Sequence, residues 1–296
     1  MVTNSKDIDQ MIKDNILPEI TDDNYYDDEI NQNYMSFHMW LSLHGCDGVL
    51  KCEAKTMAEM KHEYVDEEED DTALLIGSYV DAVLAGDDGE LDKFKDAHPE
   101  IFVSRGENKG ELKATYKMAE KMIERCQKDE LFMGFMAGEK QRIFTAELWG
   151  IPFKCKIDSY MPFGKPIIVD LKTTRDMHKT FFRPDIGHID FVSYYGYIYQ
   201  LALYREIVKA VTGVSCKCYI CAVSKGKHPD IQPIEVDDFS LDSAIDEIER
   251  SIKFSPLVDV WQGTAEPTRC ESPSCPYCLD TKKSSLINYK DLIMTF

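Results

Sequence analysis

Three strand-like segments with very short connections between them place the strongest constraint on the fold. The segments are RIFTAELW (142–149), PFKCKIDSY (152–160) and PIIVDLKTT (166–174). A turn at Gly150 joins the first two, and the loop PFGKP (162–166) joins the last two. These short connections predict an antiparallel meander, because parallel strands need a crossover of about a dozen residues or more.

Helices are expected on both sides of this meander in the sequence. They lie at about 34–43 with Ser36 as a possible cap, at 73–86 after Thr72, at about 112–128, at 191–213 and at about 241–254. Two more strands, CKCYICAV (216–223) and IQPIEV (231–236), separate the last two helices. This order predicts one α/β domain around a mixed central sheet flanked by helices.

Two acids and a lysine meet at the end of the meander. If the loop 162–166 joins the strands directly, Asp158 faces Asp170 with Cβ atoms about 5 Å apart, where two carboxylates repel unless a cation lies between them. Lys172 leaves the same face as Asp170. The side chains that point to the other face and supply the core are Ile167, Val169 and Leu171.

This grouping suits phosphodiester hydrolysis. Carboxylate oxygens hold Mg²⁺ or Mn²⁺, the ion lowers the pKa of water, and a lysine stabilises developing negative charge. An ordinary surface pair of Asp and Lys at a strand end is the alternative interpretation. A register slip of one residue would separate the two acids.

The ordered set of Asp158, the segment DLK (170–172) and QLALY (200–204) resembles the PD-(D/E)XK nuclease superfamily. Within it, the similarity is to RecB-type and phage recombination exonucleases, including RecE-like C-terminal nuclease domains, and it implies a restriction-endonuclease-like core. The segments YMSFHMWLSLHGC (34–46) and ALLIGSYVDAVL (73–84) are also similar to family segments.

The resemblance implies a role for each matching position. Asp158 and Asp170 would bind the metal together with the carbonyl of Leu171, and Lys172 would be the catalytic lysine. Gln200 and Tyr204 would lie near the DNA backbone, and their spacing of four residues does place them on one helical face. Packing on an aromatic-rich helix is the ordinary alternative for those two.

One position departs from the family pattern. Asp81 stands four residues after Gly77, where the family usually has a histidine. A carboxylate is a hard ligand that suits Mg²⁺, so Asp81 is a candidate metal ligand, but the change is equally compatible with altered or lost activity. Glu147 is a further candidate ligand, although an exposed strand acid is the simpler interpretation.

The segment RCESPSCPYC contains Cys270, Cys275 and Cys278, which lie too close to prolines for a core strand. A metal site needs a fourth ligand; the resemblance implies Cys46, and Cys52 is its rival. The resemblance also implies a [4Fe-4S] cluster, with zinc as the alternative because the Cys-x4-Cys-x2-Cys spacing departs from the family's. Buried thiols are expected at Cys216, Cys218 and Cys221.

The net charge of −19 argues against nucleic acid until its distribution is considered. Residues 1–72 hold 5 Lys against 19 Asp or Glu, so the acid is concentrated in the first quarter of the chain. Runs such as TDDNYYDDEI are expected to be solvated or poorly ordered, or else to compete with DNA for a basic groove. Residues that could contact phosphates after the active strand are Arg175, Lys179 and Arg183.

These observations predict a metal-dependent exonuclease that acts on double-stranded DNA ends, with a single-strand annealing recombinase as the partner that the resemblance implies. The alternatives are a catalytically silent DNA- or protein-binding module and a CRISPR-adaptation-type or endonucleolytic relative. We expect an acidic, poorly ordered segment (1–33), a nuclease domain with its cysteine cluster (34–280) and a tail (281–296). No signal peptide or membrane span is evident, which predicts a cytoplasmic protein without membrane contact.

Overall fold

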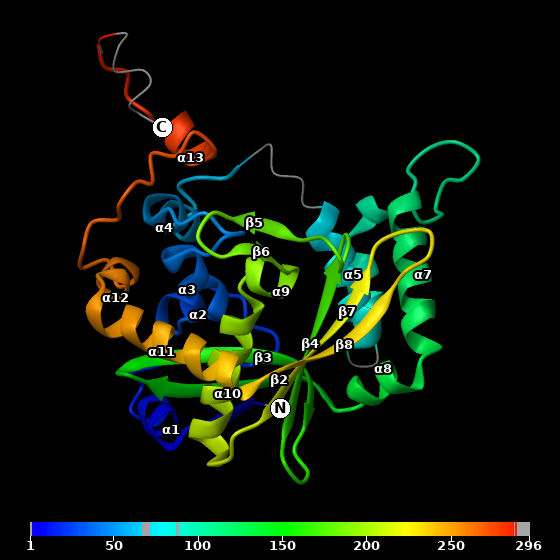
Figure 1. Cartoon of the computed structure of the whole chain (residues 1–296), viewed down its shortest axis with the longest axis horizontal. Coiled ribbons are helices and arrows are strands. Elements are labelled where there is room, and N and C mark those ends of the chain that lie inside the picture. Colours follow the sequence, from blue (N-terminus) through cyan, green and yellow to red (C-terminus); the bar gives the residue numbers. More distant parts are fainter. Residues whose placement is uncertain (1, 67–71, 87–88, 287, 289–296) are drawn as a thin grey trace.

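The computed structural model describes residues 2–66, 72–86, 89–286 and 288. Its centre is a sheet of six strands in the order β1-β2-β3-β4-β7-β8 (Figure 1). These strands are β1 (Val2–Asn4), β2 (Glu139–Leu148), β3 (Ile151–Met161), β4 (Ile167–Thr174), β7 (Lys217–Ser224) and β8 (Ile231–Val236). A separate hairpin consists of β5 (Phe181–Arg183) and β6 (Gly187–Ile189).

The pairing confirms the predicted mixed sheet. β2, β3 and β4 form the antiparallel meander, β4 and β7 are parallel, and β7 and β8 are antiparallel. The long α10 (Tyr197–Thr212) makes the crossover from β4 to β7. The carboxyl ends of β4 and β7 therefore lie at the same edge of the sheet, where loops gather side chains from both strands.

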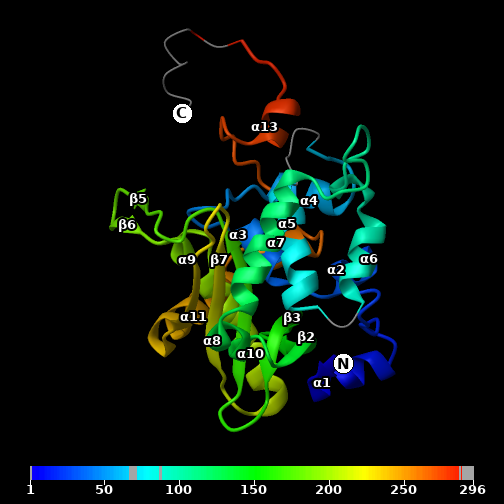
Figure 2. The same ribbon diagram turned by 90° about the vertical axis from the view of Figure 1, so that its right-hand side faces the viewer.

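Helices cover both faces of the sheet. The first hydrophobic core joins α3 (Phe37–His44), α10, α11 (Asp238–Phe254) and α12 (Leu257–Trp261) to one face. The second joins α5 (Thr72–Leu84), α7 (Ala114–Gln127) and α8 (Glu130–Phe135) to the other face of β4 and β7 (Figure 2). The shorter helices are α1 (Lys6–Lys13), α2 (Asp28–Asn33), α4 (Glu53–Met60), α6 (Glu90–Ala97), η1 (Pro99–Ile101), α9 (Phe191–Tyr194) and α13 (Pro276–Asp280).

The expectation of one continuous helix over 191–213 is wrong. α9 ends at Tyr194, Gly196 has a φ of 73°, and α10 begins at Tyr197. This left-handed backbone conformation is open to glycine without a steric penalty, so Gly196 interrupts the helix where the hydrophobic pattern continues. The break changes the direction of the chain between two neighbouring tyrosines, Tyr195 and Tyr197.

The N-terminal segment is folded, contrary to the expectation that residues 1–33 are poorly ordered. β1 adds to the sheet parallel to β2, and Ile8, Ile20 and Ile30 form a third core with Ile143 of β2. The buried Lys154 of β3 donates to the carbonyl of Tyr25 at 2.5 Å and to Asn31 Oδ1 at 2.7 Å. The alternation of isoleucines and tyrosines among the acids explains how so acidic a segment folds onto the sheet.

Two predicted segments fall largely outside the described residues. Of the acidic run near residue 70, positions 67–71 are not described, and of the tail 281–296 only 281–286 and 288 are. Across the described parts of the chain, no helix combines the length and the apolar character needed to cross a membrane.

Candidate functional site

The acidic residue Asp158 lies where β3 and β4 separate. The two strands pair from Met161↔Ile167 to Ser159↔Val169, and beyond that point they diverge (Figure 1). The Asp158 carboxylate replaces the next backbone partner, because its Oδ2 accepts a hydrogen bond from the Leu171 amide at 2.7 Å. Asp158 is thus held against the strand that carries Asp170, close to the position that cross-strand pairing predicted.

Asp170 is buried, with 5% of its surface exposed, and is held from both sides. Gln200 of α10 donates to its Oδ1 at 2.8 Å, and Lys172 Nζ lies 2.7 Å from its Oδ2. Although Lys172 forms this ion pair, Oδ2 accepts no well-aligned hydrogen bond from any described residue. A buried carboxylate oxygen with remaining acceptor capacity fits a divalent cation.

Lys172 is the positive charge of this centre. Its Nζ lies 4.7 Å from the ring centroid of Tyr197, above the aromatic face. Burial opposes its charge, but Asp170, Tyr197 and the contact with the Asp170 carboxylate outweigh this effect and raise the pKa of Lys172. The side chain therefore stays protonated and can donate hydrogen bonds to an anion.

Asp81 of α5 reaches the same centre from the opposite face. Burial and the charge of Asp158 raise the pKa of Asp81 well above its usual range, although Lys172 partly opposes this. Burial and the charge of Asp170 raise the pKa of Asp158 to about 6. Acids that resist ionisation in this way regain their charge when a cation binds, so Asp158 and Asp170 are candidate ligands, and Asp81 acts on them through its charge.

Gly77 lets α5 approach β4 only to ordinary contact distance. A Cβ built at Gly77 would lie 3.5 Å from Thr173 Oγ1, which a methyl group tolerates. The position of Asp81 therefore depends on the whole packing of α5, through buried residues such as Tyr79 and Val80, and not on that glycine alone.

The pair of residues expected on α10 lies together as its spacing predicts. Gln200 Nε2 also donates to the Tyr204 hydroxyl at 3.1 Å, and both side chains are buried. Tyr204 thus holds Gln200, and Gln200 holds Asp170. In this structure Gln200 and Tyr204 therefore orient the Asp170 carboxylate through hydrogen bonds from α10.

Two residues of the centre are missing from the sequence-based set. Gln141 donates to Asp158 Oδ1 at 3.1 Å, and Tyr197 covers Lys172. Only Gln141 carries a usable signal, since it sits opposite Asp158 once the first two predicted strands are paired.

Glu147 and the three basic residues after β4 lie outside this group. Glu147 is exposed and pairs with Pro152 at the far end of β2, which agrees with the simpler interpretation. Arg175 and Lys179 are exposed in the loop that follows β4. Arg183 on β5 forms ion pairs with Asp47 at 3.1 Å and with Asp185 at 2.5 Å.

Four cysteines form a second cluster: Cys52, Cys270, Cys275 and Cys278, whose sulfur atoms all lie within 4.8 Å of one another. The choice of Cys46 as the fourth member is wrong, and its rival Cys52 takes that place. Cys46 instead donates through Sγ to the Tyr194 carbonyl at 3.3 Å. Cys52 begins α4, whose packing beside α12 and the chain at Thr268 brings it to the C-terminal cysteines.

The cysteine cluster has the spacing of a compact metal site. Cys278 Sγ lies 3.7 Å from Cys52 Sγ and 3.7 Å from Cys270 Sγ. Burial raises the pKa of the Cys278 thiol, but hydrogen bonds from the backbone at Glu271 and from its neighbouring thiols lower it overall. The Cys278 thiol therefore loses its proton more readily than an ordinary cysteine.

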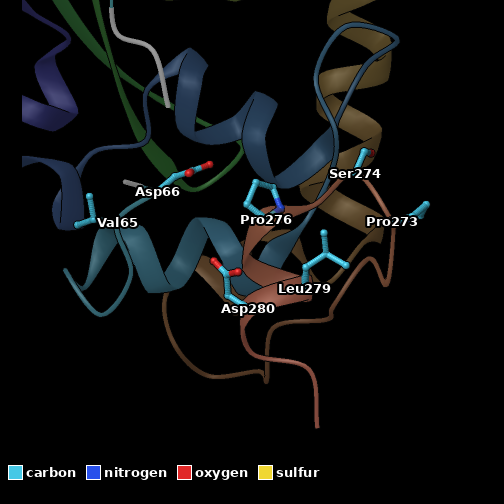
Figure 3. Close-up of a pocket in the computed structure, with 7 residues that line it drawn as sticks. All are labelled: Val65, Asp66, Pro273, Ser274, Pro276, Leu279 and Asp280. Carbon is cyan, nitrogen blue, oxygen red and sulfur yellow. The ribbon is translucent and has the colours of Figure 1, made fainter. Parts of the chain in front are cut away.

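A pocket of about 620 Å³ lies beside this cluster (Figure 3). It is lined by Val65, Asp66, Pro273, Ser274, Pro276, Leu279 and Asp280. None of the carboxylates near Lys172 lines it, so this hollow belongs to the cysteine end of the molecule. As predicted, Cys216, Cys218 and Cys221 are buried in the core, and so are Cys126 and Cys155.

Two comparisons with known proteins, a family model and a crystal structure, agree with the resemblance to PD-(D/E)XK nucleases. Residues 42–281 match a family model described as "PDDEXK-like domain of unknown function (DUF3799)". The chain is similar to the crystal structure of a "Putative exonuclease" from Eubacterium rectale, with 40% sequence identity and a TM-score of 0.83, over 93% of this chain and 98% of that one. The structure of SSO0001 is 13% identical with a TM-score of 0.26, over 69% of this chain and 86% of that one. No curated protein matches the chain.

Proposed function

The chain belongs to the PDDEXK-like family, and from this premise we propose that it is a metal-dependent DNA exonuclease of phage or prophage recombination type. The observation that carries the proposal is the position of Asp158 at the Leu171 amide, beside Asp170 and Lys172. Similarity to the Eubacterium rectale protein, which is described as a "Putative exonuclease", supports the same activity, since the two chains share fold and length.

Asp158 and Asp170 would hold Mg²⁺ or Mn²⁺, with Asp81 and the Leu171 carbonyl as additional oxygen ligands. The bound ion would lower the pKa of a coordinated water and stabilise charge on the phosphate. Lys172 donates hydrogen bonds to the attacking water or to the phosphate oxygens, because its ammonium lies beside Asp170. Gln200 fixes the direction of the Asp170 carboxylate through Oδ1, which leaves Oδ2 for Lys172 and the cation.

Cleavage of linear and closed circular duplex DNA tests this proposal. The purified protein should degrade linear duplex with Mg²⁺ or Mn²⁺ and stop in EDTA, and closed circles should survive longer. Equal cutting of both forms would identify an endonuclease. If folded, metal-loaded protein cut neither form, Asp81 in place of the usual histidine would favour a catalytically silent binding module.

The partner proposed for this activity is a single-strand annealing recombinase, because trimming one strand at a duplex end exposes the other strand for annealing. Co-purification of the two proteins on a tailed duplex would test it.

We also propose that Cys52, Cys270, Cys275 and Cys278 hold one tetrahedral zinc ion in preference to a [4Fe-4S] cluster. Four sulfurs at about 2.3 Å from zinc lie about 3.8 Å apart in a tetrahedron, close to the two 3.7 Å separations. The ion would connect α4 to the C-terminal segment. Elemental analysis of anaerobically purified protein separates the two: stoichiometric zinc supports this assignment, and iron with sulfide and brown colour contradicts it.

A further inference from the structure

The hairpin of β5 and β6 stands out from the body of the molecule (Figure 2). Its base is fixed, because the ring of Phe181 stacks on Tyr194 with centroids 3.6 Å apart. The backbone of Gly48 donates to the Tyr194 carbonyl at 2.8 Å, and Arg183 pairs with Asp47. The hairpin is therefore held rigidly beside the end of β4, although it lies outside the main sheet.

The outward face of the hairpin carries an apolar ring without a packing role. Phe182 is 68% exposed, and the only described ring close to it is that of His188, with centroids 5.6 Å apart. Tyr195, which follows α9, is 36% exposed. Single exposed apolar side chains are common on protein surfaces, so the two rings gain their meaning from their neighbours and from the charge around them.

A series of aromatic contacts links this hairpin to the catalytic lysine. Lys172 Nζ lies over the ring of Tyr197, and the Tyr197 ring lies 5.9 Å from that of Tyr195 at an interplanar angle of 29°. Tyr195 then meets Phe181 edge to face, with centroids 5.7 Å apart. These contacts connect Lys172 to Phe181 at the base of the hairpin. Phe182, the next residue of β5, leaves the opposite face of the strand, where its ring lies beside His188.

The charge of this region is opposite to that of the whole chain. Residues 172–188 hold four Lys or Arg and two Asp, and residues 225–230 hold two Lys and one Asp, in a chain of net charge −19. The two segments lie together, because Lys225 donates its backbone amide to the Thr174 carbonyl and His178 pairs with Asp230 at 3.2 Å. The exposed cations among them are Arg175, Lys179 and Lys227.

We propose that this region binds single-stranded DNA as it enters or leaves the catalytic centre. We name it the hairpin surface, and it consists of Arg175, Lys179, Phe182, Tyr195 and Lys227. Bases stack on the ring of Tyr195 beside the base of the hairpin and on the ring of Phe182 on its outer face, while the cations contact the phosphates. The proposal rests on the proposed nuclease function and adds a substrate feature to it: an unpaired strand, since bases within a duplex cannot stack on a protein ring.

Fluorescence anisotropy with full-length protein in EDTA tests the hairpin surface without cleavage. The probe is a labelled oligothymidine of about 12 nucleotides, compared with an abasic strand of the same length and charge. The protein should bind oligothymidine more tightly than the abasic strand, and Phe182→Ala should weaken oligothymidine binding by about 5- to 100-fold. Lys179→Ala should weaken both probes and reduce the dependence of binding on salt.

Phe239→Ala is the matched control, because Phe239 is 83% exposed on α11 and lies outside the hairpin surface. This variant should bind both probes as the unaltered protein does. Equal affinity of the unaltered protein for the two probes, or equal loss in Phe182→Ala and Phe239→Ala, would overturn the proposal. Binding that depends on Phe182 in a protein that cuts no DNA would support the hairpin surface and reject the nuclease function instead.

Discussion

The amide of Leu171 donates a hydrogen bond to the Asp158 carboxylate, so the backbone of β4 positions this acid. The same strand carries Asp170 and Lys172, whose side chains form an ion pair. The hydrogen bond to Asp158 spans the point where β3 leaves β4. The two acids therefore lie on two strands of the sheet, at the point where these strands separate. Strands hold side chains more rigidly than a loop does.

Asp170→Asn should abolish cleavage while the protein stays folded. Asparagine has nearly the same volume, so packing against Gln200 survives, but the ionic ligand is lost. Loss of one transition-state contact typically costs about 10²- to 10³-fold in rate, and we expect at least that. Rates on linear duplex and circular dichroism measure the two effects. Glu147→Gln is the control, and a fully active Asp170→Asn would contradict the assignment.

Gln200→Leu should reduce the rate about 10- to 100-fold and raise the concentration of Mg²⁺ needed for half-maximal activity. The reason is the loss of the hydrogen bond that orients Asp170. Tyr204→Phe keeps that bond and removes only the contact behind it, so its effect should be smaller. Metal titrations of both variants measure this order. An equal response of the two would show that α10 packing alone matters.

Asp158→Asn should stabilise the metal-free protein at neutral pH. The pKa of Asp158 is about 6 in the fold and 3.8 ordinarily, so the native state binds more protons between these values and loses stability as the pH rises through them. Asparagine avoids this loss. Thermal unfolding in EDTA should give a higher midpoint for the variant at neutral pH and a shrinking difference towards pH 3.8. A pH-independent difference would assign the effect to packing.

The free energy of unfolding of the unaltered protein should rise with pH in the alkaline range, and Lys154→Met should abolish this rise. Burial lowers the pKa of Lys154 from 10.5 to about 8, so the unfolded state binds more protons between these values. The unaltered protein therefore gains stability as the pH rises from about 8 to 10.5, and the variant lacks this gain. Denaturant titrations across this range measure the difference. Parallel curves for the two proteins would show that Lys154 titrates normally.

Cys52→Ser should lose the metal of the cysteine cluster, whereas Cys46→Ser should retain it. The sulfur of Cys52 belongs to the group of four, and that of Cys46 is hydrogen-bonded to Tyr194. We expect a lower unfolding temperature for Cys52→Ser, because α4 loses its connection to the C-terminal segment. Metal content and thermal unfolding of both proteins measure this, and a metal-free Cys46→Ser would contradict the structure.

The sequence predicted five of the six strands of the sheet, all but β1, because those five are encoded by local patterns. Short connections define the meander, and the register that follows from the loop 162–166 places Asp158 beside Asp170. The period of hydrophobic residues likewise predicts α5, α7 and α11. Each of these features depends on residues within about 20 positions of one another, where turn chemistry and periodicity are informative.

The errors concern contacts between distant segments. Cys46 and Cys52 are similarly far from Cys278 along the chain, and only the packing of α4 determines which of them joins the cysteine cluster. The order of the N-terminal segment depends on Ile143 and Lys154, more than 100 residues away in the chain. Charge runs describe solvation and do not reveal such a partner, so acidity alone gave the wrong expectation.

The cysteine cluster also fixes a time order during synthesis. Cys52 and Cys278 are 226 residues apart in the chain, although their sulfur atoms are neighbours. The ribosome must therefore release almost the whole domain before the four thiols can meet, whereas β2, β3 and β4 can pair long before. Until then Cys52 is a lone thiol on an incomplete chain. A chain that ends just before residue 278 contains Asp158 and Asp170 but only three of the four cysteines of the cluster.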